Sequence, residues 1–154
     1  MNTPVNIELS LMRFQSLLKV KRERDKRYIF DPIRKKWLVL QPEELVRQLV
    51  IFYLLEEKQY NRNRINLERG LKVNNLSKRF DLLVYDTNVR PYLLVECKAP
   101  QVPITRDVFQ QAAWYNMELR VPYLMVTNGI EAYCCALDYE NHSYEYLEAV
   151  PDFG

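Results

Sequence analysis

The chain has 154 residues, of which 48% are hydrophobic and 27% charged, the composition of one ordinary globular domain. Its net charge of +2 excludes a strong overall basic field, so any attraction for nucleic acid must be local. Three glycines leave no glycine-rich phosphate loop, and a single histidine excludes histidine-cluster zinc sites. We therefore expect a single domain over residues 1–154, without a nucleotide cofactor.

Cysteine usage and hydropathy indicate the compartment. The three cysteines, Cys97, Cys134 and Cys135, are odd in number and lack metal-binding spacing, which is typical of buried thiols in a reducing environment. No apolar run is long enough to span a bilayer, and no secretion signal opens the chain. We expect a cytoplasmic protein with no membrane partner.

The first 36 residues are predicted to be an extension of a core over residues 37–150. Residues 2–18 mix strand-like and helix-like spacing, so both interpretations stay open. Residues 19–36 hold nine lysines and arginines against three acids, a net charge of +6, with aromatic residues interleaved. This stretch is either a solvated strand-and-turn face or a patch that contacts phosphates.

The next segments predict a helix and then a meander of strands. Pro42 suits the first position of a helix over residues 42–59, which carries a wide apolar stripe. Three strand-like runs follow, separated by turn residues at 74–75 and 86–88. The predicted strands cover residues 65–71, 79–85 and 92–99.

The last third of the chain predicts a second helix and a hairpin. Thr105 can cap a helix over residues 106–119, and Asn128-Gly129 is a strong hairpin turn between strands 123–127 and 130–137. A short strand over residues 143–147 completes the chain. This order of elements predicts an α/β sheet with helices packed on it.

Acidic residues fall at matching positions of the three predicted strands. Glu96 and Lys98 interrupt an apolar strand and point to the same face. A turn centred between residues 88 and 89 places Asp81 opposite Glu96, and a turn centred between residues 74 and 75 places Glu68 opposite Asp81. The predicted registers therefore bring Glu68, Asp81 and Glu96 side by side, with Lys98 next to them.

Three clustered carboxylates repel one another and need a positive partner. Their oxygen ligands suit Mg²⁺, with Mn²⁺ as a substitute. Such an ion can activate water, and Lys98 can orient that water or offset developing phosphate charge. This combination predicts phosphodiester chemistry; the alternative is a salt-bridged, partly exposed strand face.

These residues resemble the PD-(D/E)XK nuclease superfamily, whose pattern is an aspartate followed by an acid-x-lysine motif. Here Phe80-Asp81 precedes Glu96-Cys97-Lys98, and Phe80 replaces the usual proline. The following helix holds Gln111 and Tyr115, a Q-x-x-x-Y motif like that of the RecB-like branch. More closely, residues 28–150 resemble the N-terminal nuclease domain of type I restriction enzyme R subunits, in a small stand-alone form. The stretches that carry this likeness include FDPIRKKW at 30–37, PEE at 42–44, RQ at 47–48, KRFD at 78–81, ECKAP at 96–100 and TNG at 127–129.

The resemblance implies a restriction-endonuclease-like three-layer fold, with helices flanking a mixed sheet. That sheet would join an antiparallel meander to a parallel strand reached through a crossover helix. It implies Asp81, Glu96 and Glu68 as metal-site acids and Lys98 as the catalytic lysine. Gln111 and Tyr115 would support the lysine or contact the DNA backbone. The first helix could also bring Glu44 toward this site. Apart from the resemblance, Arg47, Arg79 and Arg106 are either phosphate contacts or solvated surface residues.

Two functional hypotheses follow from this sequence. The first is a Mg²⁺-dependent endonuclease that hydrolyses DNA, as a homodimer or with other subunits of a restriction system. The second is a non-catalytic module that keeps the nuclease fold and binds DNA or a partner protein. An orphan domain without binding activity is a weaker third. The helicase motor of full R subunits is not in this sequence, so ATP-driven restriction is not expected of this chain alone.

Overall fold

The computed structural model describes residues 2–67, 70–73, 76–115 and 117–153. Two α-helices, α1 and α2, are joined by shorter helical turns and by three groups of strands. The helical elements are η1 (Leu11–Leu17), α1 (Pro42–Phe52), η2 (Tyr53–Glu57), η3 (Arg62–Arg64), α2 (Arg106–Tyr115) and η4 (Met117–Leu119). The strands are β1 (Val20–Glu23), β2 (Lys26–Asp31), β3 (Lys36–Val39), β4 (Ile65–Leu67), β5 (Gly70–Val73), β6 (Leu76–Arg79), β7 (Leu82–Tyr85), β8 (Pro91–Cys97), β9 (Tyr123–Thr127), β10 (Ala132–Asp138) and β11 (Ser143–Tyr146).

The central sheet has six strands in the order β11-β10-β9-β8-β7-β4. Strands β8 and β9 pair in parallel, and α2 lies between them in the chain as the crossover helix. The other neighbouring strands pair antiparallel. The predicted mixed sheet, an antiparallel meander with one parallel pair, is confirmed.

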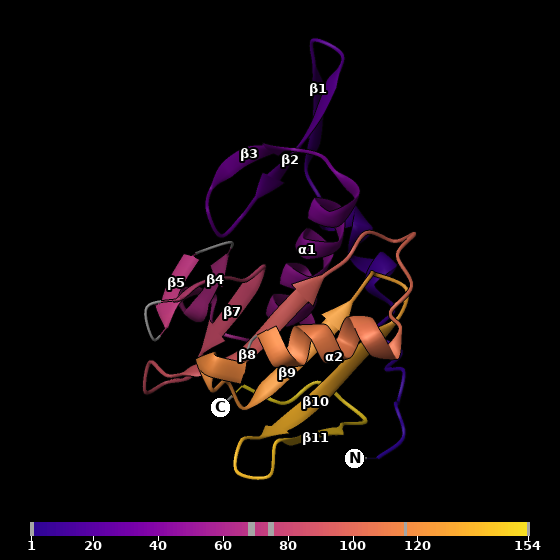
Figure 1. Ribbon diagram of the computed structural model, residues 1–154. Helices are drawn as coiled ribbons and strands as arrows, with labels where there is room; N and C mark the ends of the chain where they lie inside the picture. The colour runs from indigo at the N-terminus through magenta and orange to yellow at the C-terminus, as the bar shows by residue number, and fades with distance from the viewer. Residues whose placement is uncertain (1, 68–69, 74–75, 116, 154) are drawn as a thin grey trace.

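Each face of this sheet is covered by one helix. Leu49 and Val50 of α1 share a buried cluster with Leu93 and Val95 of β8. Residues Phe109 and Ala113 of α2 share a second cluster with Leu94, because successive side chains of a strand point to opposite faces. Figure 1 shows α2 in front of the sheet and α1 behind it. The three-layer arrangement is confirmed.

Both helices begin where the sequence predicts and become irregular before their predicted ends. Pro42 occupies the first turn of α1, and the Val108 N–H donates to the Thr105 Oγ1 at the start of α2. After Phe52 the first helix continues as a π-helical turn, and after Tyr115 the second gives way to η4. The predicted ends at residues 59 and 119 are wrong as α-helix boundaries.

The predicted strand registers are confirmed where they are described. Strand β7 pairs with β8 through Leu82–Val95, Leu83–Leu94 and Val84–Leu93, and a bulge follows at Tyr85. The register predicted between the first two strands is found in β4–β7 and continues in the β5–β6 hairpin.

The expectation of one continuous strand over residues 79–85 is wrong, because β6 ends at Arg79 and β7 begins at Leu82. The continuity predicted for residues 65–71 depends on residues 68–69, which lie outside the described residues. Asp81 forms a bend between β6 and β7. Its carboxylate accepts the backbone N–H of Cys97, so a side chain takes the place of a ladder partner there.

The basic stretch forms a separate antiparallel sheet in the order β1-β2-β3. This sheet stands beyond one end of the central sheet, at the top of Figure 1. None of the helices among the described residues has the length and apolar character that a bilayer crossing requires.

Candidate active site

Asp81 lies where α1 approaches the C-terminal end of β8. Its Oδ2 accepts the Cys97 N–H at 2.8 Å, and its Oδ1 accepts a hydrogen bond from Arg47 Nη2 at 3.2 Å. Asp81 and Glu96 are the residues directly beyond the last β7–β8 pair, Leu82–Val95. The bend thus fixes the Asp81 carboxylate against the strand that carries the other predicted site residues.

Arg47 is 5% exposed and links Asp81 to a second carboxylate on its own helix. Its Nη1 donates to Glu44 Oε1 at 2.6 Å, and Gln48 Nε2 donates to Glu44 Oε2 at 3.0 Å. The spacings of three and four residues place these side chains together on one face of α1. The apolar stripe holds α1 against the sheet, and the side chains of Glu44, Arg47 and Gln48 therefore lie near the C-terminal end of β8.

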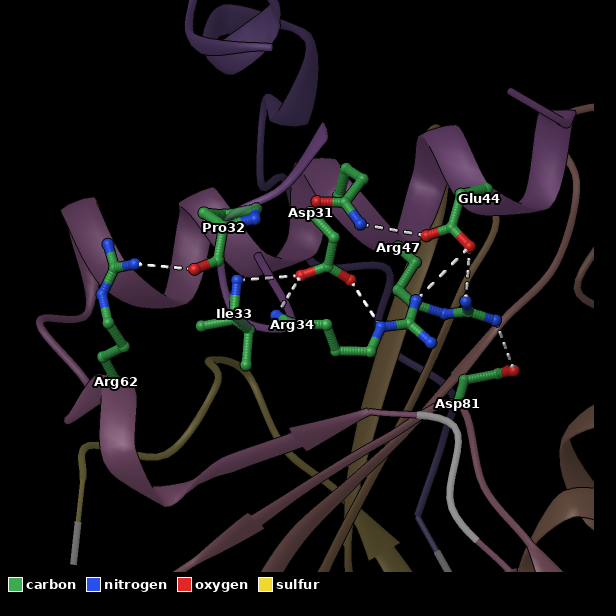
Figure 2. Close-up of polar contacts among 9 residues, drawn as sticks. Asp31, Pro32, Ile33, Arg34, Glu44, Arg47, Arg62 and Asp81 are labelled. Atoms are coloured by element: carbon green, nitrogen blue, oxygen red, sulfur yellow. Dashed lines mark hydrogen bonds and ion pairs between the residues drawn. The ribbon is translucent and has the colours of Figure 1, made fainter. Parts of the chain in front are cut away.

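The ion pairs continue from α1 to the turn between β2 and β3. Arg34 Nη2 lies 3.8 Å from Glu44 Oε1, and Arg34 Nε donates to Asp31 Oδ2 at 2.8 Å. Asp31 is fully buried, and its Oδ1 also accepts the backbone N–H groups of Ile33 and Arg34. Figure 2 shows this ion-pair chain of alternating charge, formed by Asp31, Arg34, Glu44, Arg47 and Asp81.

The Cys97 thiol lies among acidic groups. Burial raises the pKa of Cys97 well above its ordinary range, and the negative charges of Asp81, Glu96 and Glu43 raise it further, while Arg47 opposes them. The thiol is therefore protonated at neutral pH in the absence of a metal. Glu43, in the first turn of α1, thus acts on the same thiol as Asp81 and Glu96.

Glu96 and Lys98 lie at the end of β8. Glu96 is half-buried and pairs with Val126 of β9 in the parallel ladder. The Lys98 N–H donates to the Thr127 carbonyl at 2.8 Å, which extends this ladder by one residue. Strand alternation puts Glu96 on the same face as Leu94, the face that α2 covers.

The other predicted site residues are Gln111, Tyr115 and Glu68. Gln111 is exposed on α2, and Tyr115 is the last residue of that helix. Among the described side chains, no hydrogen bond or ion pair joins Lys98 to Gln111. The predicted position of Glu68 lies outside the described residues.

The donor chemistry fits a hard divalent cation, although the described residues do not form a complete ligand set. Asp81 and Glu96 offer carboxylate oxygens, and the neighbouring thiol is protonated. Within the described ranges, no group of three or more histidine, cysteine, aspartate or glutamate side chains is placed to hold a metal. Both oxygens of Asp81 instead accept hydrogen bonds, from a guanidinium and from a backbone amide.

Sequence reasoning missed the contact between Arg47 and Asp81. The spacing of Glu44, Arg47 and Gln48 was the available signal, because it predicts one polar group on one helix face. No local spacing relates α1 to residue 81 or to the turn at Asp31, since those contacts depend on how α1 packs.

Comparisons with known proteins place the fold in a family. The family model described as type I restriction enzyme R protein N terminus (HSDR_N) matches residues 42–151. The structure is similar to a fragment of a putative HsdR subunit of a type I restriction enzyme from Vibrio vulnificus YJ016, with a TM-score of 0.52 and 21% identity. That similarity covers 73% of this chain and 24% of the Vibrio chain. A search of curated proteins gave no match. On the strength of the family match, the chain belongs to the type I restriction enzyme R protein N-terminus family.

Proposed function

We propose that this protein is a Mg²⁺-dependent endonuclease of the PD-(D/E)XK type that hydrolyses DNA phosphodiester bonds within a restriction-modification system. The observation that carries the proposal is the junction of Asp81 with β8, where its carboxylate accepts the Cys97 N–H beside Glu96 and Lys98. Membership of the R-subunit N-terminal family supports the same chemistry. A homodimer or other restriction subunits are the partners we propose for cutting both strands.

The proposed roles follow from the chemistry of each group. Asp81, Glu96 and Glu68 would hold Mg²⁺ or Mn²⁺, which when bound supplies Lewis acidity toward water and phosphate. Lys98 supplies a positive charge at the end of β8, suited to orienting the attacking water or offsetting charge on the phosphate. We propose Gln111 and Tyr115 as residues of α2 that support Lys98 or contact the DNA backbone.

Plasmid nicking tests the proposal. We expect purified protein to convert supercoiled plasmid to open circles with Mg²⁺ or Mn²⁺ and to be inactive in EDTA. Lys98→Ala removes the ammonium and keeps the ion pairs of Asp81, so its activity should fall at least about 100-fold. The matched control is Lys58→Ala, because the Lys58 ammonium pairs with Asp152 and lies outside the site. Equal nicking by all three proteins would identify a contaminating nuclease and end the proposal.

The alternative function is a non-catalytic module that binds DNA or a partner protein. The observation that favours it is Arg47, which already offsets the charge of Asp81 as a cation would. Isothermal titration with Mn²⁺ in the presence of DNA separates the two functions. The nuclease is supported if Mn²⁺ binding gives a saturable heat signal with the wild type and none with Asp81→Asn. The non-catalytic module is supported if the protein binds DNA but gives no heat signal with Mn²⁺.

A further inference from the structure

The basic stretch of the sequence forms an arm that projects from the domain. The sheet β1-β2-β3 extends past the end of the central sheet toward which β8 runs (Figure 1). The predicted active site lies at this same end, because Glu96 and Cys97 are the last residues of β8. The arm and the site therefore share one side of the molecule.

One face of the arm combines lysines with aromatic side chains. Tyr28 and Phe30 alternate along β2 with Ile29 and Asp31, which are fully buried, so the half-buried aromatic pair lies on the opposite face of the strand. Phe30 packs edge-on against Trp37 at 5.3 Å between ring centroids, and Trp37 is 39% exposed. We call this surface the basic face; it comprises Lys19, Lys21, Lys26, Tyr28, Phe30 and Trp37.

The lysines of the basic face lie against these rings. Lys21 Nζ is 4.4 Å from the centroid of Trp37, and Lys19 Nζ is 5.7 Å from that of Phe30. Such cation–π contacts hold the ammonium groups above the sheet and leave their outer sides to water. Glu23 also approaches Lys21, at 3.7 Å, in an exposed ion pair that contributes little.

Charge is strongly divided between the arm and the rest of the chain. Residues 19–36 have a net charge of +6, whereas the whole chain has a net charge of +2. The rest of the chain therefore has a net charge of −4. The charges of Glu43, Asp81 and Glu96 act on the Cys97 thiol, and the single guanidinium of Arg47 opposes only part of them, so the remaining negative charge would repel a phosphodiester backbone. A local source of positive charge beside the site would offset this repulsion.

Buried contacts fasten the arm to the domain. The turn that follows β2 is held by Asp31 and Arg34, through which the ion-pair chain reaches α1 and Asp81. Arg62 of η3 also donates to the Pro32 carbonyl of this turn at 3.0 Å. The base of the arm is thus tied to η3 and to α1, and α1 contacts Asp81 through Arg47.

We propose that the basic face binds the phosphodiester backbone of DNA beside the active site. The proposal rests on DNA being the substrate of the proposed function, and it assigns binding to residues that take no part in cleavage. The ammonium groups supply contacts to phosphates, and the partly exposed ring of Trp37 supplies a surface for a base where strands are open.

Fluorescence anisotropy tests this binding in EDTA, where cleavage cannot occur. Labelled duplex DNA and one of its single strands are titrated at several salt concentrations between about 50 and 200 mM. The double variant Lys19→Gln with Lys26→Gln should bind on the order of tenfold more weakly, with a salt slope smaller by about 0.9 for each phosphate that is no longer neutralised. A loss on both DNA forms assigns the face to the backbone, and a loss confined to the single strand assigns it to opened DNA.

The matched control is Arg90→Gln with Arg120→Gln, which also removes two exposed charges. Arg90 directly precedes β8, and Arg120 lies three residues before the start of β9, so both are at the opposite end of the central sheet. Wild-type affinity and slope in the lysine variant, or an equal loss in the arginine variant, would overturn the proposal. Absence of nicking by wild-type protein would overturn only the nuclease function, because binding is measured without metal.

Discussion

Arg47 is a buried cation between two carboxylates. A guanidinium stays protonated in proteins, so its burial on α1 requires negative partners, and Glu44 and Asp81 provide them at 2.6 and 3.2 Å. Any cation that binds Asp81 must compete with this guanidinium. In the absence of metal, Arg47 therefore holds Asp81 in place and offsets the negative charge of that carboxylate.

Replacing Arg47 separates its structural role from its competition with metal. Arg47→Met should lower the free energy of unfolding by about 3–5 kcal/mol, because Glu44 and Asp81 lose a buried partner. Mn²⁺ should restore more stability to this variant than it adds to the wild type, since the competing guanidinium is gone. Urea unfolding in EDTA and in Mn²⁺ measures both effects.

The control for this experiment is Arg13→Met. Arg13 pairs with Glu57 at 3.4 Å on the surface, and such exposed pairs contribute less than about 1 kcal/mol. We expect Arg13→Met to lower the free energy of unfolding only slightly. Mn²⁺ should stabilise this variant as much as it stabilises the wild type. Equal stabilisation of wild type and Arg47→Met by Mn²⁺ would refute the competition.

At the scale of elements, the turn between β9 and β10 is fixed by Asn128 and Gly129. The Asn128 Oδ1 accepts the N–H groups of Ile130 and Glu131, and Gly129 has a φ of +91°. A Cβ at Gly129 would lie 3.3 Å from Val46 Cγ2 of α1. This turn therefore needs glycine for its backbone conformation and for its approach to the helix.

Gly129→Ala tests this requirement. The positive φ alone should lower the free energy of unfolding by about 1–2 kcal/mol, and the tight approach to Val46 should add to it. Urea unfolding of the same substitution in a Val46→Ala background should show a smaller penalty that does not vanish. An unchanged midpoint for Gly129→Ala would contradict the argument.

The sequence predicted elements well where the signal is local. The bounds of β9, the start of α1, the hairpin turn at Asn128 and the β7–β8 register all follow from neighbouring residues. The bend at Asp81 was not predicted, because it depends on a hydrogen bond to Cys97 in another strand. The contacts of the arm with α1 were missed for the same reason.

At the scale of the whole molecule, the three cysteines are distributed over the two buried clusters, one on each face of the central sheet. Cys97 and Cys134 lie in the cluster beneath α1, and Cys135 lies in the cluster beneath α2. Burial raises the pKa of Cys134 to about 12, and it raises the pKa of Cys135 still further. As predicted from the sequence, all three thiols are buried.

Thiol reactivity should therefore follow global unfolding. At pH 8 the native protein should react very slowly with a disulfide reagent, since the nucleophile is the thiolate and a raised pKa depletes it. Raising the pH within the range in which the protein stays folded should increase the native rate, and denaturant should release all three thiols together. Rapid labelling of one cysteine in native protein at pH 8 would show that one layer opens independently.

The ion-pair chain from Asp31 to Asp81 has a consequence for how DNA would be cut. Because buried charges join the base of the arm to the site, the two keep one separation. A strand held by both would be cleaved at a constant number of nucleotides from the phosphates that the arm protects. When hydroxyl-radical footprints of unrelated DNA sequences are aligned on the scissile bond, the protected nucleotides should then fall at the same distance from the cut.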